Sequence, residues 1–147
     1  MGLFSFLKDV GEKLGIGSED EAPPAEDLKK SVEDLGLEAE GLDVKVEGDT
    51  VKVAGTAPSS SIREKIILAL GNVTGVASVD EAIEVETKEP DAVFYEVKKG
   101  DTLWAISEAH YGKGKGGEYN RIFEANKPML KHPDKIYPGQ VLRVPPM

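Results

Sequence analysis

The sequence predicts an α+β protein in which a short N-terminal helix precedes two small domains. Apolar residues recur at helical spacing in some stretches and at every second position in others, and the two patterns alternate along the chain. At 147 residues there is room for two modest hydrophobic cores. No apolar run approaches the roughly 20 residues of a membrane span, so no membrane-spanning segment is expected.

Residues 1–14 have the pattern of an amphipathic helix. Its apolar positions follow the spacing i, i+3/i+4, i+7: Leu3, Phe6, Leu7, Val10 and Leu14. We expect this helix to pack on its own protein. Attachment to a membrane surface is the alternative, but two basic and two acidic side chains balance to zero and give no attraction to anionic lipid. Residues 15–24 then form an acidic linker.

Residues 25–88 predict the order αββαβ. The first helix carries Leu28, Val32 and Leu35 on one face and ends near Gly36. Two alternating strands follow, joined by a tight turn at Gly48-Asp49. Their apolar positions are Leu42, Val44, Val46, Val51 and Val53.

A second helix is expected over 59–70, with serines as its N-cap and Gly71 as its stop. Its inward positions are Ile62, Ile66, Ile67 and Leu70. The last strand carries Ala77, Val79, Ile83 and Val85 at period two. This order, together with Val51-x-Val53-x-Gly55 and Val73-x-Gly75-Val76-x-x-Val79, resembles a BON domain.

Residues 93–146 predict the order βααβ. A strand and a glycine turn lead to Asp101, the expected N-cap of a helix carrying Leu103, Ile106 and Ala109. A second helix is expected over roughly 117–126, and a Pro-Gly turn then leads into the strand 141–143. The segment resembles a LysM domain in three motifs: Gly100-Asp101-Thr102-Leu103, Glu124-Ala125-Asn126 and Ile136-x-Pro138-Gly139-Gln140-x-Leu142.

The charge is unevenly distributed along the chain. Residues 1–92 hold 9 Lys and Arg against 21 Asp and Glu, whereas residues 93–147 hold 9 against 6. The acidic front half argues against nucleic acid and anionic membrane as partners. The charge of +3 on the second half is too weak to indicate either of them as its partner.

The sequence contains no catalytic constellation. There is no cysteine, and the only histidines, His110 and His132, are 22 residues apart. The Lys- and Gly-rich run at 112–117 lacks the Ser or Thr that follows the lysine of a phosphate loop. We therefore predict a binding protein and not an enzyme.

The N-terminus does not match a signal peptide. No basic region precedes the apolar residues, the apolar run stops at Lys8, and no small-residue cleavage site follows. We expect a cytoplasmic location, away from the peptidoglycan that the LysM resemblance implies as a ligand.

The whole chain is similar to the family of bacterial cytoplasmic potassium-binding proteins. The similarity runs from Met1-Gly2-Leu3-Phe4, through Gly71-Asn72-Val73-Thr74-Gly75-Val76, to Pro133-Asp134-Lys135-Ile136-Tyr137. It implies a small monomeric protein that binds K+ selectively and becomes compact when it does. It also implies that the BON domain and the N-terminal helix hold the ion.

A K+ site favours neutral main-chain carbonyls, because many carboxylates would favour divalent ions instead. Helix ends supply such carbonyls, since the last four C=O groups have no partner within the helix. If the first helix breaks at Gly11, the carbonyls of Leu7 and Val10 become available; Leu14 favours a helix that continues. Beyond the second BON helix, the predicted ligands are the carbonyls of Gly71, Val73 and Val76. An ordinary C-cap followed by a turn is the alternative there.

A second function belongs to a different class. The groove between the 100–103 turn and the 136–139 loop could hold N-acetylglucosamine units, which would make the protein a peptidoglycan-binding adaptor of the cell envelope. Trp104 on the first LysM helix is expected to be half-buried in packing, with a ligand platform as the alternative.

Overall fold

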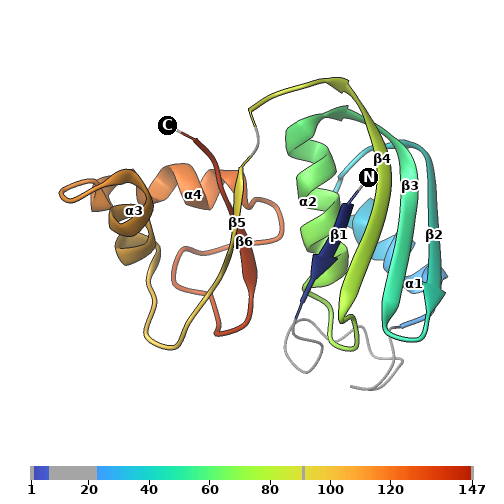
Figure 1. Cartoon of the computed structure of the whole chain (residues 1–147), viewed down its shortest axis with the longest axis horizontal. Coiled ribbons are helices and arrows are strands. Elements are labelled where there is room, and N and C mark those ends of the chain that lie inside the picture. Colours follow the sequence, from blue (N-terminus) through green and yellow to red (C-terminus); the bar gives the residue numbers. More distant parts are fainter. Residues whose placement is uncertain (1, 7–22, 91, 147) are drawn as a thin grey trace. The chain divides into compact units, whose positions relative to one another are not determined.

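The computed structural model describes residues 2–6, 23–90 and 92–146, and the chain divides into two compact units, Met1–Glu89 and Pro90–Met147 (Figure 1). Each unit combines helices with a β-sheet, which confirms the predicted α+β class. Within the described part of the chain, every helix is too short or too polar to cross a membrane.

The first unit is a four-stranded sheet covered on one face by two helices (Figure 1). The helices are α1 (Ala25–Asp34) and α2 (Ser60–Gly71). The strands are β1 (Gly2–Ser5), β2 (Glu40–Glu47), β3 (Thr50–Ser59) and β4 (Ser78–Thr87), in the order β1-β4-β3-β2. β2 and β3 form the predicted hairpin, whereas β3 and β4 are parallel because α2 crosses between them.

The amphipathic helix predicted over residues 1–14 is wrong for its first turn, because Gly2–Ser5 form strand β1. This strand pairs antiparallel with β4, with Leu3 opposite Asp80 and Phe4 opposite Val79. Pairing covers an edge of the sheet whose backbone groups would otherwise be open. The rest of the predicted helix, including Leu7 and Val10, lies outside the described residues.

Side chains near the N-terminus alternate as a strand requires. Leu3 and Ser5 are exposed, Phe4 is half-buried and Phe6 is buried. The two phenylalanines therefore share the face of the sheet that the helices cover.

Helix α2 begins as predicted, since Ser59 is the N-cap and its Oγ accepts a hydrogen bond from the Ile62 amide at 3.3 Å. Leu68 is buried in addition to the predicted core positions Ile66, Ile67 and Leu70. It is buried because α2 contacts α1 as well as the sheet.

The second unit has the predicted order βααβ. Its elements are β5 (Val93–Glu96), α3 (Leu103–Tyr111), a 3-10 turn η1 (Gly116–Glu118), α4 (Tyr119–Ala125) and β6 (Val141–Val144). β5 and β6 pair antiparallel. The core consists of Val97, Leu103, Ile106, Ile122, Leu130, Leu142 and Val144.

The predicted N-cap of α3 is wrong by one residue. Thr102 caps the helix, and its Oγ1 accepts from the Ala105 amide at 3.1 Å. Asp101 Oδ2 instead accepts hydrogen bonds from the Tyr95 hydroxyl at 2.6 Å and from the Lys98 amide at 2.8 Å. Its carboxylate closes the turn that leads from β5 into α3, so it is not available as a cap.

Candidate functional site

Residues 71–77, here called the α2–β4 segment, contain all three BON residues predicted as ligands. Gly71 is the last residue of α2, and Val73 and Val76 follow it in a tight turn. All three are buried. Gly75 between them has φ +99°, a conformation that glycine adopts without strain. The structure therefore brings these predicted residues together within one short buried turn.

The hydrogen bonds of this segment leave some of its carbonyls available. The Val76 amide donates to the Val73 carbonyl at 3.1 Å, which turns the chain toward β4. Among the described residues, none is seen to donate a hydrogen bond to the carbonyl oxygen of Gly71 or of Val76. The Gly71 carbonyl also lies at the C-terminal, electronegative end of a 12-residue helix. This end of α2 is suited to a cation.

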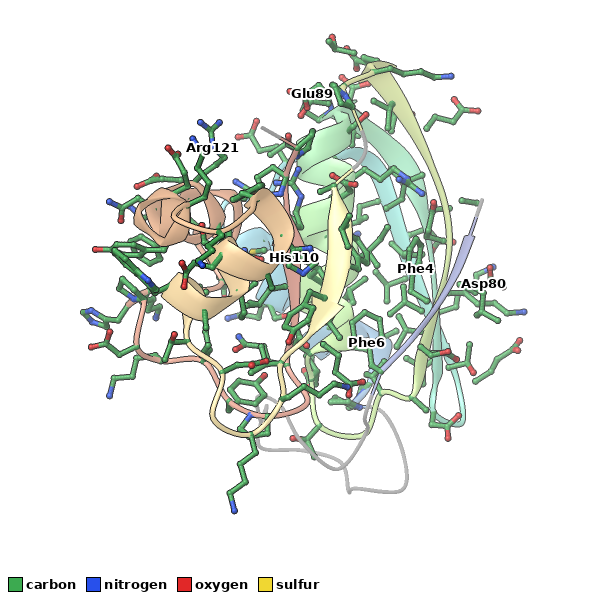
Figure 2. The ribbon with its side chains drawn as sticks, turned by 60° about the vertical axis from the view of Figure 1, so that its left-hand side comes forward. Phe4, Phe6, Asp80, Glu89, His110 and Arg121 are labelled. Carbon is green, nitrogen blue, oxygen red and sulfur yellow. The ribbon has the colours of Figure 1, made fainter. Side chains whose placement is uncertain are left out.

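The α2–β4 segment is fixed by hydrogen bonds from two other parts of the unit. The Asp49 carbonyl, in the turn between β2 and β3, accepts from the Ala77 amide at 2.8 Å. The Phe6 amide, just beyond β1, donates to the Ala77 carbonyl at 2.8 Å. Figure 2 shows the Phe6 side chain at this end of β1, toward α2. The predicted ligands Leu7 and Val10 follow Phe6 directly in the chain but lie outside the described residues.

An ion pair between Arg63 and Glu81 was missed by sequence reasoning. The Arg63 Nε donates to Glu81 Oε1 at 2.9 Å, and one terminal guanidinium nitrogen contacts the same oxygen. The Glu81 side chain is fully buried. The signal was present in the sequence, since Glu81 stands between Val79 and Ile83 at a position of β4 that faces the core.

Several carboxylates lie at the end of the first sheet that is opposite the α2–β4 segment. A groove of about 860 Å³ lies beside the end of α1 and the start of β2. Its acidic residues are Glu33, Glu38, Glu40 and Glu86. Within residues 2–6, 23–90 and 92–146, no three His, Asp or Glu side chains are grouped closely enough to hold a metal ion.

The second unit has a groove of about 580 Å³ between the start of α3 and the loop before Ile136. Trp104 and Tyr119 line it, with ring centroids 6.1 Å apart. A Cβ on Gly116 would lie 2.2 Å from the Trp104 ring, so this ring packs directly on the glycine. Trp104 is nevertheless 54% exposed. Trp104 is thus more exposed than the expected half-buried packing, although part of its ring packs on Gly116 and the residue lines the groove.

Comparison with known proteins identifies both units. The BON domain model matches residues 20–87, and the LysM domain model matches residues 95–145. The protein named "Potassium binding protein Kbp" of Escherichia coli O6:H1 is 46% identical over 149 residues, covering 99% of this chain and 99% of that protein. This chain belongs to the Kbp family. The family resemblance found in the sequence is thereby confirmed. In this Kbp family member, the α2–β4 segment lies within the BON match and the groove beside Trp104 within the LysM match.

Proposed function

We propose that this protein binds K+ selectively through main-chain carbonyl oxygens of Gly71, Val73 and Val76, together with those of Leu7 and Val10. The observation that carries the proposal concerns the carbonyl oxygens of Gly71 and Val76. Both residues are buried, yet no described residue donates to either carbonyl. Buried carbonyls nearly always have a polar partner, and a bound cation supplies one. The name of the 46% identical relative supports K+ as that cation.

Neutral carbonyls favour K+ over the competing ions of the cell. K+ gives up its hydration shell more readily than Na+, and a ring of carbonyl oxygens replaces that shell. Divalent ions favour carboxylates, and the acidic residues of the large groove lie at the other end of the sheet from the α2–β4 segment.

The proposed role is that of a monomeric cytoplasmic sensor or buffer, a binding protein without enzymatic activity that uses neither nucleic acid nor membrane. The unit 1–89 is acidic and the second unit is basic, and only a short connection joins them. An ion that binds one conformation better shifts the equilibrium toward it, and here that conformation is the compact one. Small-angle scattering in matched KCl and NaCl tests this, and equal radii of gyration in the two salts would rule out compaction.

Calorimetric titration with KCl and with NaCl at fixed ionic strength tests the site. We expect heat of binding for K+ and much less for Na+. Gly75→Ala strains the turn that carries the carbonyls and should weaken K+ binding at least tenfold. Gly36→Ala is the matched control, because Gly36 also has a positive φ, +77°, but lies between α1 and β2. Equal K+ affinity in both variants would contradict coordination by the α2–β4 segment.

The LysM groove supports a second candidate function, the binding of N-acetylglucosamine oligomers as a peptidoglycan adaptor. An aromatic ring with one free face beside a groove is a common platform for sugars, and Trp104 has both features. Trp104 is the only tryptophan in the chain, so its fluorescence reports on this groove alone. A saturable change on addition of chitooligosaccharide would favour this function, and an unchanged spectrum at millimolar sugar would exclude it.

A further inference from the structure

The ring of Phe6 lies directly on Gly71, the last residue of α2. A Cβ built on Gly71 would fall 2.1 Å from Cζ and 2.2 Å from Cε1 of that ring. Both residues are buried, with Phe6 7% exposed. No side chain larger than hydrogen fits at position 71 while the ring stays in place.

This contact explains why a glycine ends the helix. Gly71 is helical and has no positive φ, so its backbone conformation does not require glycine. A glycine within a helix costs about 1 kcal/mol relative to alanine. The close approach of the Phe6 ring explains why a glycine stands here despite that cost.

Phe6 therefore holds the α2–β4 segment at both ends. Its ring covers Gly71 at the start of the segment, and its amide donates to the Ala77 carbonyl at the end. The strand that leads to Phe6 is weakly held by itself, since β1 has four residues and one neighbouring strand, β4. Docking of β1 and the shape of the α2–β4 segment thus depend on the same residue.

We propose that Phe6 is a positioning residue for the ion site, which couples the docking of strand β1 to the placement of the carbonyls in the α2–β4 segment. This inference rests on the proposed K+ function. The coupling is reciprocal: K+ stabilises docked β1, and loss of docking weakens K+ binding by the same factor.

A double-mutant cycle measured by K+ titration tests the proposal. Phe6→Ala removes the ring, whereas Gly71→Ala leaves Phe6 intact but displaces its ring. We expect each variant to lower K+ affinity at least tenfold, and the double variant to be no weaker than Phe6→Ala alone, because both changes break one contact. Leu3→Ala is the matched control on the same strand, because Leu3 is 68% exposed, and it should stay within threefold of wild type.

Hydrogen exchange separates positioning from a general loss of structure. In the wild-type protein, K+ should slow exchange of the Phe6 amide, which donates to the Ala77 carbonyl. In Gly71→Ala, which retains a good helix former at the end of α2, this protection should be lost although the sheet stays folded.

The outcomes are distinguishable. If the wild-type protein bound no K+, the proposed function and this inference would both be wrong. If the wild-type protein bound K+ and Phe6→Ala bound it with unchanged affinity, only the proposed role of Phe6 would be wrong. Additive losses from Phe6→Ala and Gly71→Ala would also overturn it, since the two residues would then act independently.

Discussion

Arg63 on α2 donates from Nε to Oε1 of Glu81 on β4 at 2.9 Å, and the Glu81 side chain has no exposed surface. The pair connects the helix that ends at the proposed ion site to the strand that begins just after it. It brings a charged side chain of α2 to a buried carboxylate on β4, an inner strand of the sheet.

Arg63→Met should destabilise the first unit by about 3–5 kcal/mol, because it removes the cation that Arg63 places beside the buried Glu81 carboxylate. Adding Glu81→Leu should restore most of that loss. Native-state hydrogen exchange of the β3 and β4 amides is the measurement, since the two units need not unfold together. Lys30→Met provides the control, because the Lys30–Asp34 pair is exposed and its loss should cost less than about 1 kcal/mol. Similar losses in the two single variants would contradict this view of the pair.

Asn126 should be the most sensitive polar residue of the second unit. Its Nδ2 donates to the Ile122 carbonyl at 2.7 Å and the Arg143 carbonyl at 2.9 Å, and its Oδ1 accepts from the Arg143 amide at 2.8 Å. Asn126→Ala removes three hydrogen bonds to buried backbone groups and should cost about 3 kcal/mol in unfolding free energy. Asn120→Ala is an exposed change on α4, the helix that Asn126 follows, and should cost under about 1 kcal/mol. Urea unfolding followed by Trp104 fluorescence reports both values.

Tyr95 and Asp101 should make the stability of the second unit depend on alkaline pH. The hydrogen bond to Asp101, with burial, raises the pKa of Tyr95 from 10.0 to about 12. A pKa that is higher in the folded state gives stability that is complete below the unfolded pKa and is lost as pH rises to the folded one. Wild type should therefore exceed Tyr95→Phe in stability below pH 10, and the difference should vanish toward pH 12. A constant difference across this window would show that the hydroxyl does not titrate as expected.

The same pair acts at acidic pH with the opposite sign. The hydrogen bond from Tyr95 and that from the Lys98 amide hold the pKa of Asp101 below its ordinary 3.8. The stability from this carboxylate is present above pH 3.8 and is lost as pH falls through the lowered pKa. The unfolding free energies of wild type and Asp101→Ala should converge at low pH in chemical unfolding experiments. A difference that stays constant as pH falls would contradict this role of the carboxylate.

K+ affinity should be independent of pH between about 6 and 9 if main-chain carbonyls are the ligands, because they do not titrate in this range. Titrations at fixed ionic strength measure it. A steep rise of affinity with pH would show that a histidine or a carboxyl group with a raised pKa takes part, and it would contradict carbonyl coordination.

Sequence periodicity predicted most of the first unit because its strands and helices bury one face each. Val51 and Val53 at period two, and Ile66 and Ile67 with Leu70 at helical spacing, leave no competing assignment. The N-terminal strand was missed because Leu3 and Phe6 fit a helix while Phe4 and Phe6 fit a strand. Pairing with β4, about 75 residues away, decides between the two, and local pattern carries no information about it.

The candidate site was predictable in part for a related reason. Glycines at 71 and 75 mark the turn after α2, so Gly71, Val73 and Val76 could be chosen from sequence. The contact of Phe6 with Gly71 and the Arg63–Glu81 pair could not, since each joins residues from different elements. The N-cap of α3 was misplaced because Asp101 and Thr102 are both good capping residues, and the Tyr95 hydroxyl engages the first of them.

The position of β1 has a consequence for how the chain is made. Gly2–Ser5 are synthesised before their partners Ser78–Glu81, which follow only after strands β2 and β3 have been made. Closing a loop of that length costs entropy that a four-residue strand offsets poorly. Strand β1 should therefore be the last element added during biosynthesis, and a nascent chain released before residue 78 would hold a sheet whose final edge is still open.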